Sequence, residues 1–130
     1  MNQFYEVTLK SIEILKDKKT EPLQAWNAAC DELKLTESVK GKPCPKATFL
    51  CLFQENKLWE LEDYKINEYL EPTKSYTLFA INLLKQNGRN NYNNGLQLWK
   101  DIMKKFKENR NHNQEMDVLL ALWDLGLIKP

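Results

Sequence analysis

Two short stretches decide the fold: "LQAW" at residues 23–26 and "LQLW" at residues 96–99. From each stretch onward, apolar side chains recur at every third or fourth position, which is typical of an amphipathic helix. The first stripe comprises Leu23, Trp26, Ala29, Cys30 and Leu33, and the second comprises Leu96, Trp99, Ile102, Met103 and Phe106. The two stripes correspond position by position, so both tryptophans are predicted to lie in the core.

The segments around these stripes also repeat. "TLKSIEILK" (8–16) corresponds to "TLFAINLLK" (77–85), and "FLCLFQENKL" (49–58) corresponds to "VLLALWDLGL" (118–127). Internal similarity of this kind indicates one supersecondary unit used twice. We therefore expect an all-α fold of about six helices, in two pseudo-repeated three-helix units (3–58 and 74–128) that are joined by a connector (59–73).

The predicted helices cover residues 3–17, 21–34, 45–56, 74–87, 94–109 and 114–125. The third helix of each unit is apolar on nearly every side, which predicts burial. These two helices are expected to pack against each other, each covered by the first and second helices of its own unit. The 130 residues would then form a single helical domain, residues 1–130, around one shared core.

The helix ends carry recognisable signals. Thr20, Asn93 and Asn113 are predicted N-caps, Pro45 is predicted to open the third helix, and Gly126 is predicted to end the last one in a left-handed conformation. The connector has a few apolar residues that favour a short helix only weakly. No segment combines strict alternation with β-branched residues, so no sheet is expected.

Charge and hydropathy exclude several classes of function. Lysine and arginine total 19 against 18 aspartates and glutamates, and a net charge of +1 implies no general attraction to polyanions. No stretch approaches the roughly twenty apolar residues that cross a bilayer, and the first residues lack the apolar core of a signal peptide. Three cysteines without Cys-x-x-Cys spacing suit reduced thiols. We expect a cytoplasmic protein with no membrane partner.

Metal and cofactor sites are not expected. A zinc site needs about four ligands at usable spacings, whereas the one histidine, His112, lies far along the chain from Cys30, Cys44 and Cys51. The four glycines are scattered, so no loop resembles a phosphate-binding motif.

Cysteine-dependent catalysis is the weakest alternative. Cys44 lies at the predicted N-terminus of a helix, between Lys42 and Lys46, where a thiol is activated. His112 occupies the corresponding connection of the second unit, so the pseudo-symmetry would bring a base toward this nucleophile. The more frequent interpretation is that Cys44 is a helix-cap residue and His112 a solvated loop residue. We therefore expect a non-enzymatic protein.

Basic residues lead into each third helix, which makes nucleic-acid binding the main alternative. The candidates are Lys40, Lys42 and Lys46 in the first unit and Lys104, Lys105, Lys107 and Arg110 in the second. "LWDLGLI" (122–128) is similar to the end of a winged-helix recognition helix. Against this, the third helices lack a polar face, and Glu115 and Asp117 would repel phosphate. We therefore favour binding to another protein, through exposed helix or connector surface.

A family resemblance covers nearly the whole chain. "CPKATFLCL" (44–52), the Ala25–Trp26 pair and "NQEMDVLLALWDLGLI" (113–128) resemble an uncharacterised family of small bacterial proteins, a domain of unknown function. The pattern is a Cys-Pro-Lys-x-x-Phe-Leu-x-Leu segment and a C-terminal Trp-x-x-Gly-Leu-Ile helix end. "NKL" (56–58) departs from the usual Gly-Leu ending. The resemblance implies a bacterial cytoplasm and this fold unit, without an activity.

Overall fold

The computed structural model describes residues 3–17, 20–54, 71–112 and 114–129, and every regular element in these ranges is helical. The elements are α1 (Gln3–Asp17), α2 (Pro22–Glu32), α3 (Glu37–Lys40), α4 (Pro43–Gln54), α5 (Glu71–Asn87), the 3-10 turn η1 (Arg89–Asn91), α6 (Gly95–Phe106) and α7 (Glu115–Asp124). The predicted all-α class is confirmed. Each of the six predicted helices is present with ends displaced by at most three residues, whereas α3 and η1 were not predicted. The short helix suggested for the connector falls outside the described residues.

Two of the predicted N-caps are wrong by one residue. The N-cap of α2 is Glu21, which forms a capping box with Gln24, and Pro22 opens the helix. The N-cap of α6 is Asn94, whose side chain accepts a hydrogen bond from Gln97 N. Thr20 and Asn93 bond instead to Gln24 and Gln97, the same residues that complete the two caps. Adjacent polar residues compete for each cap, and backbone conformation decides between them.

The ends of the third helices also differ in detail from the prediction. Pro45 lies in the first turn of α4, which already begins at Pro43. The N-cap position of α7 is Gln114, and Asn113 lies outside the described residues. Gly126 follows α7 with a φ of 73°, which confirms the predicted left-handed end.

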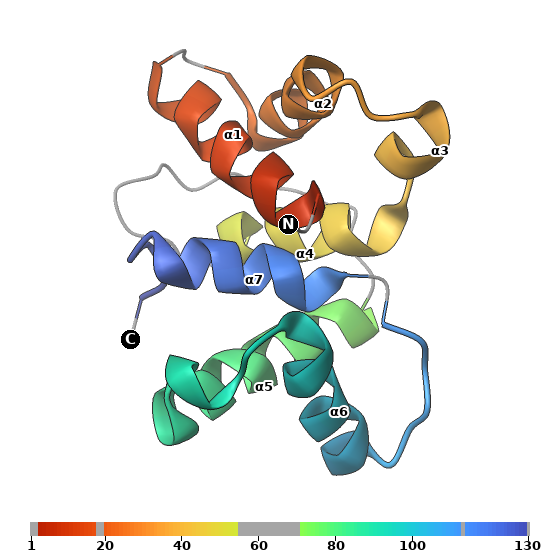
Figure 1. The fold of residues 1–130 in the computed structure, drawn as a ribbon, viewed down its shortest axis with the longest axis vertical. Coiled ribbons are helices and arrows are strands. Elements are labelled where there is room, and N and C mark those ends of the chain that lie inside the picture. Colours follow the sequence, from red (N-terminus) through yellow and green to blue (C-terminus); the bar gives the residue numbers. More distant parts are fainter. Residues whose placement is uncertain (1–2, 18–19, 55–70, 113, 130) are drawn as a thin grey trace.

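Helices α4 and α7 form the centre of the molecule and lie alongside each other, as predicted. Figure 1 shows them crossing the middle, with α1, α2 and α3 above and α5 and α6 below. Every residue of α7 from Glu115 to Leu122 is buried. The covering helices do not follow the prediction fully, because α1 packs on α7 and α5 packs mainly on α4. Each first helix thus crosses to the third helix of the other half, while α2 covers α4 and α6 covers α7.

The two tryptophans occupy aromatic clusters, one on each side of the central pair. Trp26 packs on Phe49, with ring centroids 5.0 Å apart, and Trp99 packs edge-on against Tyr76 at 5.3 Å. Both indoles are buried, as predicted. The indole N–H of Trp99 donates to Arg110 O at 2.9 Å, whereas that of Trp26 has no acceptor among the described residues.

The two leucines that open the stripes are not in the core. Leu23 is 42% exposed and Leu96 is 46% exposed, and Phe106 at the other end of α6 is 36% exposed. Ala25 and Leu98 are buried instead. The buried face of each second helix is therefore rotated toward these residues, which lie on the other flank of the tryptophan. The prediction of a core position for Leu23 and Leu96 is wrong.

No helix in the described ranges combines the length and the apolar character that a bilayer-crossing segment requires.

Candidate functional site

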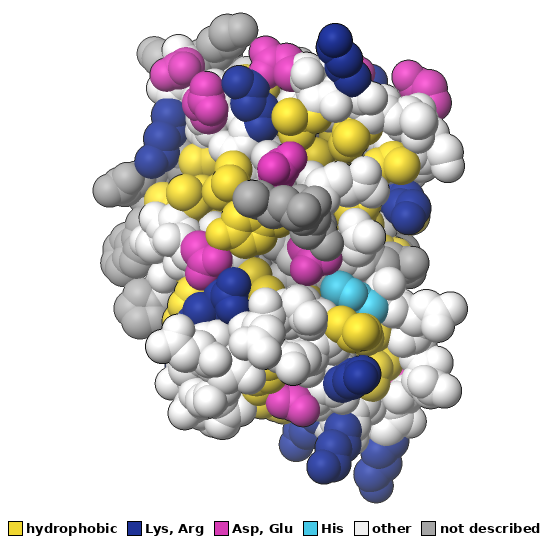
Figure 2. Space-filling model, in the orientation of Figure 1, with side chains coloured by type: hydrophobic (Ala, Val, Ile, Leu, Met, Phe, Trp, Pro, Cys, Tyr) yellow, Lys and Arg dark blue, Asp and Glu magenta, His cyan; other side chains and the backbone are white. Residues whose placement is uncertain are grey.

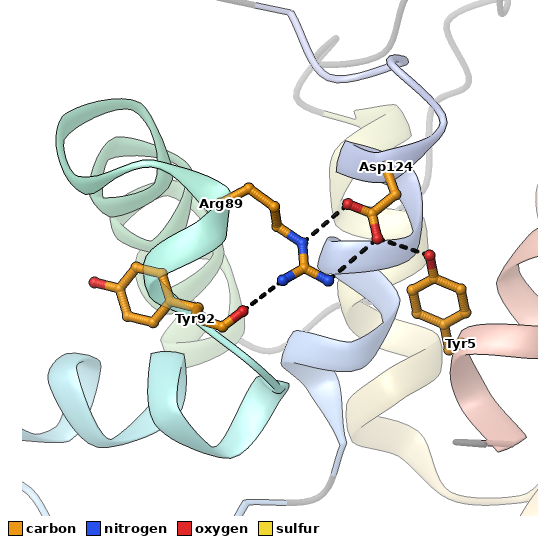
Figure 3. Close-up of polar contacts among 4 residues, drawn as sticks. All are labelled: Tyr5, Arg89, Tyr92 and Asp124. Atoms are coloured by element: carbon orange, nitrogen blue, oxygen red, sulfur yellow. Dashed lines mark hydrogen bonds and ion pairs between the residues drawn. The ribbon is translucent and has the colours of Figure 1, made fainter.

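A polar cluster joins three parts of the molecule at the C-terminal end of α7. Arg89 Nε lies 2.9 Å from Asp124 Oδ1, and Arg89 also donates through a second nitrogen to Oδ2 at 3.2 Å. Tyr5 of α1 donates to the same Oδ2 at 2.7 Å, and Arg89 donates to Tyr92 O as well. Figure 3 shows the arginine fork facing the carboxylate, with Tyr5 on the opposite side. Every charge in this cluster has a partner within it, so we assign it a structural role.

Tyrosine hydroxyls donate hydrogen bonds to two further carboxylates in residues 73–129. Tyr92 donates to Asp101 Oδ2 at 2.8 Å, and Tyr76 donates to Glu108 Oε2, also at 2.8 Å. Burial is the main cause that raises the pKa of both hydroxyls, and the carboxylates raise it further, although a hydrogen bond from Asn87 offsets part of the rise at Tyr92. Both hydroxyls remain protonated donors. Arg110 Nε lies 2.7 Å from Glu108 Oε2, so the predicted nucleic-acid contact Arg110 already has an anionic partner.

The remaining carboxylates of residues 73–129 are also turned inward. Glu115 and Asp117 in the first turn of α7 are 6% and 8% exposed. Together with Asp101, Glu108 and Asp124, they complete the five acidic residues of this part of the chain. All five are therefore either bonded to a neighbouring side chain or buried.

The lysines of α6 and of its C-cap have no such compensation. Lys100, Lys104 and Lys107 are exposed and form no ion pair with any residue of the described ranges. Lys105 Nζ lies 5.9 Å from the centroid of Phe79, at cation–π distance. Figure 2 shows Lys and Arg side chains gathered at the lower end of the molecule, where α6 ends in Figure 1.

Leu96 lies on the same side of α6 as two of these lysines. Leu96, Lys100 and Lys104 follow at intervals of four residues, which places neighbours roughly 6 Å apart along the helix and on adjoining parts of its surface. We call these three residues the α6 stripe. It combines one exposed apolar side chain with two uncompensated positive charges.

The matching surface of α2 has a different character. Aligning Leu23 with Leu96 places Asn27 opposite Lys100 and Asp31 opposite Lys104. Lys40 Nζ lies 2.7 Å from Asp31 Oδ1, and Lys10 Nζ lies 3.2 Å from Glu32 Oε2. The charges of α2 are thus neutralised within the protein, whereas those of the α6 stripe face solvent.

The first predicted basic group is less exposed than the second. Lys40 is held by Asp31, and Lys42 and Lys46 are half-buried. Burial raises the pKa of the Cys30 thiol, and the nearby charges of Lys40 and Lys46 offset this rise only in part. Figure 1 shows the α3–α4 connection and the α6–α7 connection on the same, right-hand side of the view.

Cys44 and His112 lie near the N-terminal ends of α4 and α7, which both begin at the right in Figure 1. His112 is half-buried rather than a solvated loop residue: its Nε2 accepts from Met116 N at 3.3 Å, and its ring packs on Trp99. Burial lowers its pKa to about 4. A nitrogen with this low basicity, already used as an acceptor, is poorly suited to activating a thiol at neutral pH. The partners of His112 in the described part of the chain are thus Met116 and Trp99.

In the described part of the chain, no three histidine, cysteine, aspartate or glutamate side chains are grouped as metal ligands.

These observations describe an all-α protein with a central pair of buried helices and a basic stripe on one covering helix. The chain belongs to a protein family of unknown function, DUF6979, whose model matches residues 1–129. The resemblance to an uncharacterised family is therefore confirmed. No similarity is found to any curated protein or to any solved structure.

Sequence reasoning missed Leu96 and Lys100 as surface residues of interest. The apolar pattern assigned Leu96 to the core, and Lys100 is not among the basic residues predicted to contact nucleic acid. The sequence does contain a signal for this surface. At the positions where α2 has neutral Asn27 and acidic Asp31, α6 has Lys100 and Lys104. The structure then shows which of these charges have partners.

Proposed function

We propose that this protein is a non-enzymatic helical binding module that recognises another protein through the exposed face of α6. The observation that carries the proposal is the α6 stripe, where exposed Leu96 stands beside Lys100 and Lys104, neither of which has a carboxylate partner in the described ranges. Protein interfaces combine apolar contact with complementary charge in this way.

Nucleic-acid binding is the second candidate, and the observation in its favour is the cluster of exposed Lys104 and Lys107 with Lys105. Burial of α7 from Glu115 to Leu122 argues against a winged-helix mode, because a recognition helix must present side chains to a groove. The lysines also lie toward the C-terminal end of α6, whereas the N-terminus is the end of a helix that attracts phosphate. The net charge of +1 gives no long-range attraction, so we favour a protein partner.

The proposal includes the organisation of the chain and its location. We propose one domain over residues 1–130, with pseudo-repeats at 3–58 and 74–128, supported by a hydrophobic cluster to which α1, α2, α4, α5, α6 and α7 all contribute. The equivalent pairings α1–α7 and α5–α4 also support the repeat. A bacterial cytoplasm is proposed from the odd number of cysteines and the family resemblance.

A capture experiment with a matched control tests the proposal. The immobilised protein is exposed to a nuclease-treated lysate, beside a Lys100→Asn/Lys104→Asp variant and a Lys34→Asn/Lys85→Asp control with the same change in charge. Lys34 and Lys85 are exposed and lie outside α6. We expect at least one protein to be retained by the parent and the control and lost by the α6 variant.

Titration with a labelled DNA duplex at increasing salt distinguishes the second candidate. The nucleic-acid proposal would replace the protein-binding one if two results occur together. Duplex binding would weaken steeply with salt and disappear in the α6 variant, and no protein would be captured from the nuclease-treated lysate.

A further inference from the structure

We infer that the α6 stripe receives an acidic amphipathic helix of the partner protein, an inference that rests on the proposed function of α6 as a protein-binding surface. The partner helix carries one apolar side chain that packs on Leu96 and carboxylates, one helical turn apart, that pair with Lys100 and Lys104. Charge complementarity is the basis of this assignment, because both lysines are exposed and have no anionic partner in the described ranges.

The spacing of the stripe favours a helical partner. Four-residue intervals in α6 place its members roughly 6 Å apart along the axis, and residues four apart on a second helix share one face with the same rise. An extended segment offers a similar repeat, but it would lay unpaired backbone N–H and C=O groups against a helix whose own backbone groups are already bonded. A helix satisfies its own backbone and presents only side chains to the stripe.

The described acidic residues near the stripe support an occupant from outside. The acidic residues nearest in sequence are occupied, since Asp101 accepts from Tyr92 and Glu108 accepts from Tyr76 and Arg110. On α2, Asp31 is likewise occupied, because it forms an ion pair with Lys40. No carboxylate of residues 73–129 pairs with Lys100 or Lys104. Leu96, on the same side of α6, adds an apolar contact that mobile counterions do not fill.

The specificity of the stripe is tested with a displayed library of random peptides selected on the purified full-length protein, with the Lys100→Asn/Lys104→Asp variant as counter-selection. We expect the retained peptides to contain aspartates or glutamates at four-residue spacing with an apolar residue one further turn along. Retained peptides that need α6 but carry no excess of acidic residues overturn the inference and leave the proposed function standing. If no peptide depends on α6, both are overturned, and α6-dependent binding of a duplex in the same assay assigns the stripe to nucleic acid.

Charge exchange tests the direct pairing. A peptide with glutamates four residues apart should bind the parent at least tenfold more tightly than the Lys100→Glu/Lys104→Glu variant, and more weakly as salt increases. A peptide with lysines in place of the glutamates should show the opposite preference. A peptide of the same composition, with its acids on opposite helix faces, serves as control. The inference is contradicted if the parent binds this control as tightly as the peptide with glutamates four residues apart. It is also contradicted if the lysine peptide does not bind the Lys100→Glu/Lys104→Glu variant more tightly than it binds the parent. Circular dichroism confirms that the variants are folded.

Discussion

The imidazole of His112 packs on the indole of Trp99, with ring centroids 5.5 Å apart. The same imidazole accepts a hydrogen bond from Met116 N in the first turn of α7, so a side chain from the preceding connection caps this helix. Trp99 in turn bonds to Arg110 O. One histidine thereby ties the start of a central helix to the helix that carries the candidate surface.

This arrangement predicts a loss of stability in mild acid. Burial lowers the pKa of His112 from 6.5 to about 4, so between these pH values the unfolded chain binds more protons than the folded protein. The contribution of this group is fully present above pH 6.5 and is lost as the pH falls toward 4. We expect it to amount to roughly 1–2 kcal/mol, after allowance for partial exposure of the ring.

A non-titrating variant isolates this effect from the carboxylates. In His112→Gln, the side-chain carbonyl can still accept from Met116 N. The difference in the free energy of unfolding between parent and variant, measured with urea, should therefore shrink between pH 7 and pH 4.5. An unchanged difference would show that the histidine does not control the acid sensitivity.

The bonds of Asp124 predict energetic coupling between α1 and α7. Removing the carboxylate in Asp124→Ala breaks the bonds from Tyr5 and Arg89, and we expect a loss of roughly 1–2 kcal/mol. A double-mutant cycle with Tyr5→Phe should give a coupling energy of about 0.5–1 kcal/mol. The exposed pair Lys10–Glu13 is the comparison, for which less than about 0.5 kcal/mol is expected. Similar values for both pairs would contradict a special role of the cluster.

Gly95 is predicted to resist substitution by alanine. An alanine Cβ would lie 2.5 Å from Asp117 Oδ1 and 3.1 Å from both Asp117 N and His112 Cε1. Alanine at a helical position ordinarily stabilises by up to about 1 kcal/mol, but here we expect a loss of roughly 1–3 kcal/mol. Thermal unfolding measures the difference.

Gly126→Ala separates crowding from backbone strain. Nothing lies within 4 Å of a Cβ at this position, although φ is 73°, so a loss of only about 1 kcal/mol is expected. A Gly95→Ala protein as stable as the parent would show that α6 can shift away from α7.

The exposure of Leu96 predicts a tolerant position inside an otherwise sensitive helix. Leu96→Ala should lower the free energy of unfolding by less than about 1 kcal/mol, because the side chain is 46% exposed. Ile102→Ala removes a fully buried side chain and should cost about 2–4 kcal/mol. Urea unfolding of both variants provides the measurement. Equal losses would restore the core position that the apolar pattern assigned to Leu96.

The helical pattern of the sequence was enough to predict the fold class and the central pair. Nearly continuous apolar residues in α4 and α7 indicate burial on all sides, and both helices are buried. The crossing of α1 and α5 was not predictable in the same way, because it depends on which distant helix each one meets. Local periodicity contains no information on that choice.

The rotation of the buried face is also a tertiary property. The pattern at Leu23 and Leu96 fits a core stripe, yet burial of Ala25 and Leu98 turns both leucines toward solvent. For the candidate surface, the sequence identified the basic run of α6. It could not show that Arg110 and Lys40 are neutralised, because the carboxylates concerned are oriented by contacts that only the folded chain brings together.

The exchange of first helices has a consequence for how the chain can be divided. Because α1 covers α7 and α5 covers α4, neither half closes its own interior. A polypeptide cut between α4 and α5 would yield two incomplete fragments, each with a large apolar surface that only the other can shield. The halves should therefore complement each other on mixing, and an exchange of halves between two intact chains would give a swapped dimer.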